Sequence, residues 1–202
     1  MDSATPPAEP EAPPPVSPTI WNVPNRLSAA RIVLAIGCFV ALAVNAYLVA
    51  LVLFVLAAAT DWLDGYWARR FNQITQLGRI LDPFADKLIV CGVFIYLAAI
   101  PPSGVAPWMA VVVMAREMLV TALRGFVEQS GGDFSAKWAG KWKMVFQSLA
   151  IVGALVMLSY DTPSQLLVVG SHAVLWIAIA LTLYSGWGYI RSAAAAVMNA
   201  NT

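Results

Sequence analysis

Six apolar segments, each long enough to cross a lipid bilayer as a helix, constrain this chain more than any other feature. A membrane-spanning helix needs about 20 mostly apolar residues. The segments lie at residues 27–44, 46–71, 81–100, 106–128, 139–159 and 166–191. Turn-forming residues separate them, including Asn45 and the runs at 101–104, 130–133 and 161–164. The sequence therefore predicts an all-α membrane protein with six transmembrane helices.

The composition agrees with this class and also sets apart the two ends of the chain. Hydrophobic residues make up 60% of the chain and charged residues 11%, against about 25% charged in typical soluble domains. The net charge of +1 offers no basic field that would attract nucleic acid. Residues 1–19 are rich in Pro and Ala, so we expect a disordered cytosolic tail there. A short interfacial helix is expected over 20–31, and a short cytosolic C-terminal tail over 192–202.

The distribution of Lys and Arg predicts the orientation. Six crossings bring residues 20–31, 70–80, 129–138 and 192–202 to one side, and every Lys and Arg lies in these regions or in the adjoining helix halves. The opposite loops, near 45, 101–107 and 160–165, contain no Lys or Arg. Because cytoplasmic loops of membrane proteins are enriched in Lys and Arg, we expect both termini and the charged end on the cytosolic side.

Four carboxylates cluster where the second apolar segment ends and the third begins. Asp61 and Asp64 are spaced i, i+3, and Asp82 and Asp86 are spaced i, i+4, so each pair shares one face of its helix. The short turn near 72–80 would make the two helices antiparallel neighbours. An ionised Asp at the centre of a membrane helix costs about 2.5–3.5 kcal/mol, so such acids usually hold a cation or a substrate. Four carboxylates would balance two divalent cations, and oxygen ligands favour Mg²⁺ or Mn²⁺.

Small and basic residues surround these acids. Gly65 and Ala68 keep the helix face thin enough for a ligand to approach, Gly78 is expected in the turn, and Pro83 in the first turn of the third helix. Positive charge lies nearby at Arg69, Arg79 and Lys87. Acids, divalent metals and cations in one cleft suit a phosphate-bearing substrate. A salt-bridge network between two helices and the ion site of a transporter are the alternatives.

The spacing of these residues resembles that of a known family. The pattern D-x2-D-G-x2-A-R-x8-G-x3-D-x3-D is matched by Asp61, Asp64, Gly65, Ala68, Arg69, Gly78, Asp82 and Asp86. It is similar to the signature of the CDP-alcohol phosphotransferase family, over roughly residues 20–191. The segments NVPNRLSAARI, AREMLVTALRGF and KWAGKWKMVFQ resemble a bacterial branch of that family. Its members transfer a phosphatidyl group from CDP-diacylglycerol to sn-glycerol 3-phosphate and release CMP.

The resemblance implies a role for each matching position. The four aspartates would coordinate two Mg²⁺ or Mn²⁺ ions, and Asp86 would also act as the general base. The pocket for the cytidine diphosphate would be lined by Asp61, Gly65, Ala68, Arg69 and Gly78. Residues 20–191 would then be a catalytic membrane domain in the bacterial cytoplasmic (inner) membrane. The resemblance also suggests a homodimer.

A phosphate on the acceptor would need further cations. Arg116 and Arg124 are eight residues apart, about 80° around one helix, so both can face one cleft. The other candidates for the acceptor phosphate are Lys137, Lys141 and Arg31, whereas Lys143 is expected at the rim near lipid headgroups. Glu117 is expected to neutralise Arg116 or a neighbour, or to orient a ligand. Two alternatives stay open: another acceptor (serine, inositol phosphate or phosphatidylglycerol), or a divalent-cation transporter.

Overall fold

The regular structure is helical throughout the part of the chain that the structure describes. The computed structural model describes the backbone of residues 23–71, 76–129 and 138–200, without the side chains of 23–26, 61–82, 124, 126–129, 138–139 and most of 192–200. The helices are α1 (Val23–Ala43), α2 (Tyr47–Phe71), α3 (Gln76–Ala98), α4 (Pro107–Gln129), α5 (Trp138–Leu158) and α6 (Gln165–Ala200), with a 3-10 turn, η1 (Pro101–Ser103). The predicted all-α class is confirmed for these ranges.

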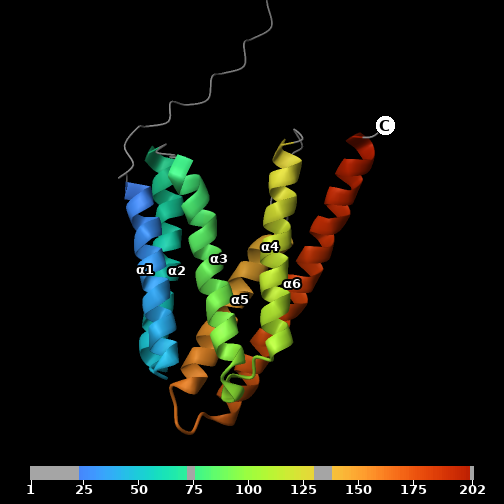
Figure 1. The fold of residues 1–202 in the computed structure, drawn as a ribbon. Coiled ribbons are helices and arrows are strands. Elements are labelled where there is room, and N and C mark those ends of the chain that lie inside the picture. Colours follow the sequence, from blue (N-terminus) through green and yellow to red (C-terminus); the bar gives the residue numbers. More distant parts are fainter. Residues whose placement is uncertain (1–22, 72–75, 130–137, 201–202) are drawn as a thin grey trace, which may run out of the picture.

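The helices form two groups that diverge toward one end of the bundle (Figure 1). α1 packs against α2 and α3, while α4 and α5 pack against α6. The groups are joined where α3 meets α4 and where α2 meets α5. The end of α2 and the start of α3 lie at the open end, together with the end of α4 and the C-terminus (Figure 1). The turns that lack Lys and Arg lie together at the opposite end (Figure 1).

Two turns at this opposite end depend on a left-handed backbone. Asn45, between α1 and α2, has φ 58°, and its side chain accepts a hydrogen bond from the Tyr47 hydroxyl at 2.8 Å. Asn is among the few non-glycine residues that adopt this conformation readily. Gly104, after η1, has φ 75°, and a Cβ there would lie 2.1 Å from Nε2 of His172. Gly104 therefore allows the His172 ring of α6 to pack directly on the turn.

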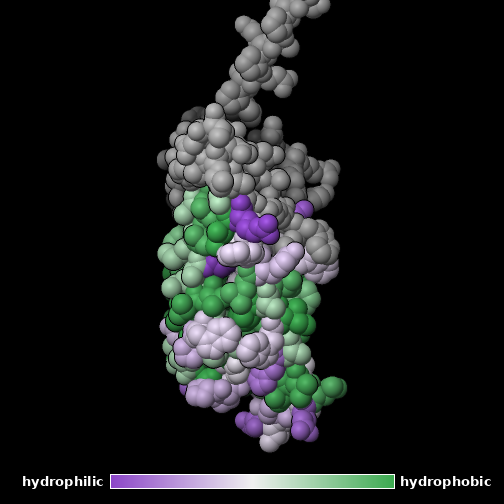
Figure 2. All heavy atoms as spheres, turned by 90° about the vertical axis from the view of Figure 1, so that its right-hand side faces the viewer, coloured by the Kyte–Doolittle hydropathy of each residue, from purple (hydrophilic) through white to green (hydrophobic). Residues whose placement is uncertain are grey.

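The bundle has an apolar core and also exposes many large apolar side chains on its outer surface. The core includes Cys38, Phe94, Leu97, Ile151 and Ile179. Apolar and aromatic residues gather across the middle of the face that carries α6 (Figure 2), including the exposed Trp176, Leu183, Tyr184 and Trp187. Within the described residues, Gly140–Leu158 and Gln165–Arg191 are long and apolar enough to cross a membrane, and Leu27–Ala43 and Tyr47–Thr60 are shorter apolar stretches. An apolar outer surface of this kind fits a membrane protein.

Three helix boundaries differ from the sequence-based expectation. α3 begins at Gln76 rather than near residue 81, so Gly78 lies in its first turn and Pro83 lies inside the helix. An interior proline removes a helical hydrogen bond, which apolar helices tolerate when neighbouring groups compensate. The separate helix expected at 20–31 is not seen in its described part, because residues 23–31 are continuous with α1. α6 continues to Ala200, so most of residues 192–202 extend that helix.

Candidate active site

Asp86 lies at the wall of a cavity that opens among four helices. It is half-buried on α3. The cavity has a volume of about 340 Å³ and is lined by Arg31 of α1, Phe54 of α2, Asp86, and Met144 and Ser148 of α5, among others. Most of the remaining lining is apolar. An acid and a basic residue are therefore brought to one largely apolar space from helices far apart in the sequence.

Arg31 is one of the most deeply buried side chains of the bundle, with an exposed fraction of 1%. Burying a guanidinium is costly unless an opposite charge lies close enough to offset the loss of hydration. Asp86 is the acidic residue on the wall of the same cavity. The structure thus brings together Asp86, the predicted base, and Arg31, a predicted acceptor-binding residue.

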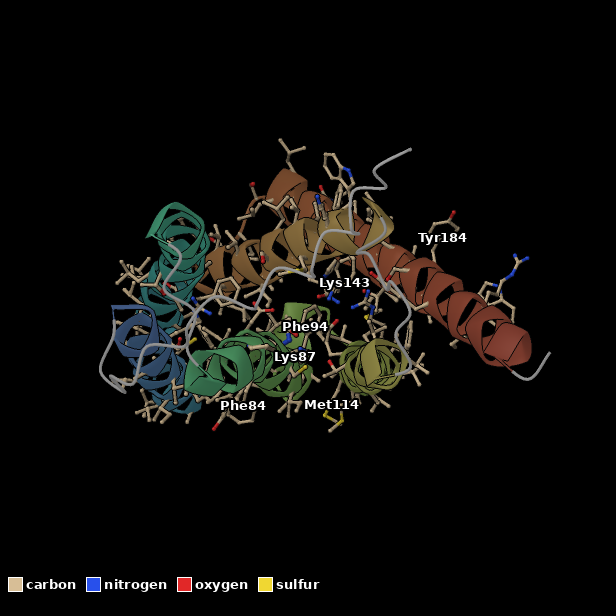
Figure 3. All side chains as sticks on the ribbon, turned by 90° about the horizontal axis from the view of Figure 1, so that it is seen from above. Phe84, Lys87, Phe94, Met114, Lys143 and Tyr184 are labelled. Atoms are coloured by element: carbon tan, nitrogen blue, oxygen red, sulfur yellow. The ribbon has the colours of Figure 1, made fainter. Side chains whose placement is uncertain are left out.

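A second cavity, of about 20 Å³, also has Asp86 on its wall. Its lining includes Asp86 and Lys87 of α3, Glu117 of α4, and Lys143 and Gln147 of α5. Viewed from above, Lys87 and Lys143 point toward the same space, which α3, α4 and α5 surround (Figure 3). Lys87 also donates a hydrogen bond to the Pro83 carbonyl at 3.2 Å. Three charged side chains, from α3, α4 and α5, thus line the same cavity as Asp86.

Glu117 holds two basic side chains in a buried cluster. Its carboxylate accepts a hydrogen bond from Nζ of Lys143 and forms an ion pair with Arg116, whose NH1 lies 3.2 Å from Oε1 and 3.4 Å from Oε2. The exposed fraction is 7% for Glu117 and 2% for Lys143. We expected Lys143 at the rim, and that expectation is wrong, because the side chain points into the bundle toward a carboxylate.

Polar groups of α6 fix the other side of Arg116. Its Nε donates a hydrogen bond to Oγ of Ser185 at 3.2 Å, and its guanidinium carbon lies 5.4 Å from the centre of the Tyr189 ring. Gly140, at the start of α5, leaves room for this arrangement, because a Cβ there would lie 3.1 Å from the Tyr189 hydroxyl and 3.8 Å from NH2 of Arg116. Arg116 therefore sits between α4, α5 and α6, joined through Glu117 to the space beside Asp86.

Most of the predicted metal and nucleotide ligands lie outside the described side chains: Asp61, Asp64, Gly65, Ala68, Arg69, Gly78 and Asp82. The same holds for Arg124 and Lys137. The backbone still assigns positions 61 and 64 to the last part of α2 and position 82 to the first part of α3, at one end of the bundle (Figure 1). Among the described side chains, no three Asp, Glu, His or Cys lie close enough to hold a metal. Lys141 is described and is exposed at the start of α5.

The sequence contained a signal for the buried Lys143 that we did not use. Lys143, Gln147, Ile151 and Leu155 are all buried, and their spacing of four residues defines the inner face of α5. Gln147 donates a hydrogen bond to Oγ1 of Thr182 on α6 at 2.9 Å, which satisfies a second polar group on that face. Because Lys143 lies on this buried face of α5, its ammonium needs a buried acidic partner. Glu117 is that partner.

The described part of the chain is thus a helical membrane bundle with an acid and several cations gathered toward its open end. The family model for CDP-alcohol phosphatidyltransferase matches residues 21–184. A relative from Bacillus subtilis (strain 168) is 34% identical over 188 residues, covering 84% of this chain and 94% of the relative. One from Rickettsia bellii (strain RML369-C) is 35% identical over 174 residues, covering 85% and 94%. Both relatives are named CDP-diacylglycerol–glycerol-3-phosphate 3-phosphatidyltransferase. The chain belongs to the CDP-alcohol phosphatidyltransferase family.

Proposed function

We propose that this protein is a phosphatidylglycerophosphate synthase. It transfers the phosphatidyl group of CDP-diacylglycerol to sn-glycerol 3-phosphate and releases CMP. The observation that carries the proposal is the meeting of Asp86, the last acid of the family motif, with Arg31 and Lys143 on adjoining cavity walls. An acid that takes a proton and cations that attract a phosphate are both required when the acceptor is an anionic alcohol.

The metal site consists of Asp61, Asp64, Asp82 and Asp86, which would hold two Mg²⁺ or Mn²⁺ ions. Such a donor set fits these metals, because its ligands are carboxylate oxygens, and Asp86 lines a cavity rather than facing lipid. Divalent ions held there would supply positive charge that stabilises the negative charge of the diphosphate. Gly65, Ala68, Arg69 and Gly78 contribute, with Asp61, to the surface that receives the cytidine diphosphate.

Asp86 acts as the general base in this scheme. A hydroxyl of glycerol 3-phosphate attacks the phosphorus of the phosphatidyl group, and Asp86 accepts the proton of that hydroxyl. The bond between the same phosphorus and the oxygen of CMP breaks, so one phosphoester bond forms as one phosphoanhydride bond is lost. The half-buried position of Asp86 on the walls of two cavities supports this role, since a base must reach the acceptor while bulk water is limited.

The phosphate of the acceptor binds to cations at the same end of the bundle. Arg31 is favoured by its place on the Asp86 cavity, and Lys141 by its exposure at the start of α5. Arg116, Arg124 and Lys137 complete the proposed set. Arg116 differs from the others because Glu117, Ser185 and Tyr189 already hold its guanidinium in place.

The membrane arrangement follows from the same proposal. The protein would cross the bacterial cytoplasmic membrane six times as a homodimer, with both termini and the active site on the cytosolic side. The turns without Lys or Arg at one end of the bundle support this orientation. Cysteine labelling would test it. With a thiol reagent that cannot cross the membrane, a cysteine introduced at Pro102 should be labelled in intact cells. A cysteine introduced at Ser3 should be labelled only after the membrane is permeabilised.

The test of the function is CMP release by the purified protein in detergent with CDP-diacylglycerol and Mg²⁺. The acceptors are glycerol 3-phosphate, serine, inositol phosphate and phosphatidylglycerol, each with an EDTA control. We expect release with glycerol 3-phosphate that EDTA abolishes and excess Mg²⁺ restores. Release with a different acceptor alone would refute the proposed acceptor. An absence of release with every acceptor would refute the enzymatic role.

A further inference from the structure

The buried carboxylate of Glu117 has no part in the chemistry described above, although it lies beside the proposed base. It shares the lining of the small cavity with Asp86, Lys87 and Lys143. Neither a metal nor the reacting phosphorus needs this carboxylate in the proposed reaction. A buried acid is nevertheless costly unless it is paired, so its contacts indicate what it is for.

Both contacts of Glu117 are to cations that retain unused donors. Nζ of Lys143 makes one hydrogen bond within the described part of the chain, to Oε1 of Glu117. An ammonium has three donors, so two are not used within the described part of the chain, and Lys143 lines the small cavity of about 20 Å³. Arg116 uses Nε on Ser185 and NH1 on Glu117, and its NH2 lies beside Gly140 at the start of α5. The cluster of Arg116, Glu117 and Lys143 carries one more positive than negative charge.

The Glu117–Lys143 contact also links two helices that each pack mainly elsewhere. α4 packs against α3 and α6, whereas α5 packs against α6, α2 and α3. The contact joins α4 and α5 through two residues that are 26 positions apart in the sequence. Without the carboxylate, Lys143 and Arg116 would be two like charges in a buried region, and their repulsion would move both away from their present positions.

We propose that Glu117 is a positioning residue that fixes Lys143 and Arg116 as a pair of anion-binding groups for the acceptor. This inference rests on the proposed function, and it adds Lys143 to the acceptor-binding cations. Glu117 touches neither substrate. It acts by holding the ammonium of Lys143 on the wall shared with Asp86, so that the phosphate of the acceptor is drawn toward the base.

The test is a set of variants measured for kcat, for the KM of each substrate and for thermal stability in detergent. Glu117→Gln keeps the shape of the side chain and removes its charge. We expect the KM of glycerol 3-phosphate to rise about tenfold or more, and the KM of CDP-diacylglycerol to change by less than about twofold. Glu117→Asp keeps the charge and should recover most of the acceptor affinity.

Two further variants separate positioning from stability. Ser171→Ala removes a part-buried hydrogen bond to the Gly153 carbonyl between α5 and α6, away from the two cavities that Asp86 lines. It should lower stability and leave both KM values unchanged. Glu117→Gln with Lys143→Met removes both charges of the contact, so the protein should fold even if Glu117→Gln alone does not. Its acceptor KM should remain high, since the ammonium is gone.

Specific outcomes would overturn the inference. An unchanged acceptor KM in Glu117→Gln, or in the double variant, contradicts the positioning role, and so does an equal rise in both KM values. If the wild-type protein shows no transfer to glycerol 3-phosphate, the proposed function fails and this role fails with it. An active wild type with a normal acceptor KM in Glu117→Gln refutes the positioning role alone.

Discussion

The two partners of the buried Glu117–Lys143 contact should differ in how much stability their removal costs. Glu117 has two cationic partners, Lys143 and Arg116, whereas Lys143 has one described partner. Replacing Glu117 by Ala leaves two buried cations without their carboxylate. Replacing Lys143 by Met leaves Glu117 still paired with Arg116 at 3.2 Å and fills the space with an apolar side chain of similar length.

The magnitudes follow from these contacts. Removing one partner of a buried ion pair typically costs about 3–5 kcal/mol, so Glu117→Ala should reduce the free energy of unfolding by about that amount. Lys143→Met loses one hydrogen bond to a charged group, about 1.5–3 kcal/mol, and regains part of it through apolar packing. We expect a net loss of about 1–2 kcal/mol for Lys143→Met. At about 2–4 °C per kcal/mol for a chain of this size, the melting temperatures should fall by about 10 °C and about 5 °C.

The assay is thermal unfolding of the purified protein in one detergent at a fixed protein-to-detergent ratio. Lys141→Met is the matched control, because Lys141 lies two residues away on the same helix and is exposed. Its melting temperature should stay within about 2 °C of the wild type, as expected for a surface substitution. The reasoning is refuted if Lys143→Met destabilises the protein more than Glu117→Ala does. Changes as small as that of the control in both variants would also contradict a buried ion pair.

Three other results are expected. Asp86→Asn should abolish transfer while binding of CDP-diacylglycerol stays measurable by calorimetry, and full activity would exclude Asp86 as the base. Arg116→Ala and Arg124→Ala should each raise the KM of glycerol 3-phosphate more than that of CDP-diacylglycerol in initial-rate measurements, and an unchanged acceptor KM in both would relocate the phosphate site. Gly104→Ala should lower the free energy of unfolding by at least about 1 kcal/mol, because alanine is strained at positive φ and its Cβ would meet the His172 ring. Denaturation in detergent measures this change, and a variant as stable as the wild type would contradict that packing.

The cluster beside Asp86 also bears on which acceptor the protein uses. Arg31, Lys87 and Lys143 line the two cavities together with Asp86. Asp86 and Glu117 line the same two cavities, so these five side chains together carry one more positive than negative charge, which an anionic acceptor would complement. Glycerol 3-phosphate supplies the missing anion, whereas serine supplies much less charge. The cluster therefore favours a phosphorylated acceptor within the family.

The sequence by itself determined much of the helical layout and the family. Apolar length and turn residues locate helices to within a few residues, because both are local properties of the chain. The i, i+3 and i, i+4 spacing of the acids fixes which of them share a helix face, again without reference to other helices. Helix ends were less accurate: α3 begins five residues before the expected position, and Pro83 lies within it, because neighbouring groups rather than local propensity decide where such a helix begins.

Only the tertiary structure decided which charged groups meet across helices. Arg31 reaches the Asp86 cavity from α1, and Lys143 turns inward to Glu117 from α5. The contact between Glu117 and Lys143 depends on how α4 and α5 are placed around α3 and α6, and local spacing contains no information about that placement. The spacing of Lys143 and Gln147 places both on one face of α5, but it does not say which carboxylate of another helix that face meets. Packing selects Glu117 here, and its carboxylate offsets the cost of burying the Lys143 charge.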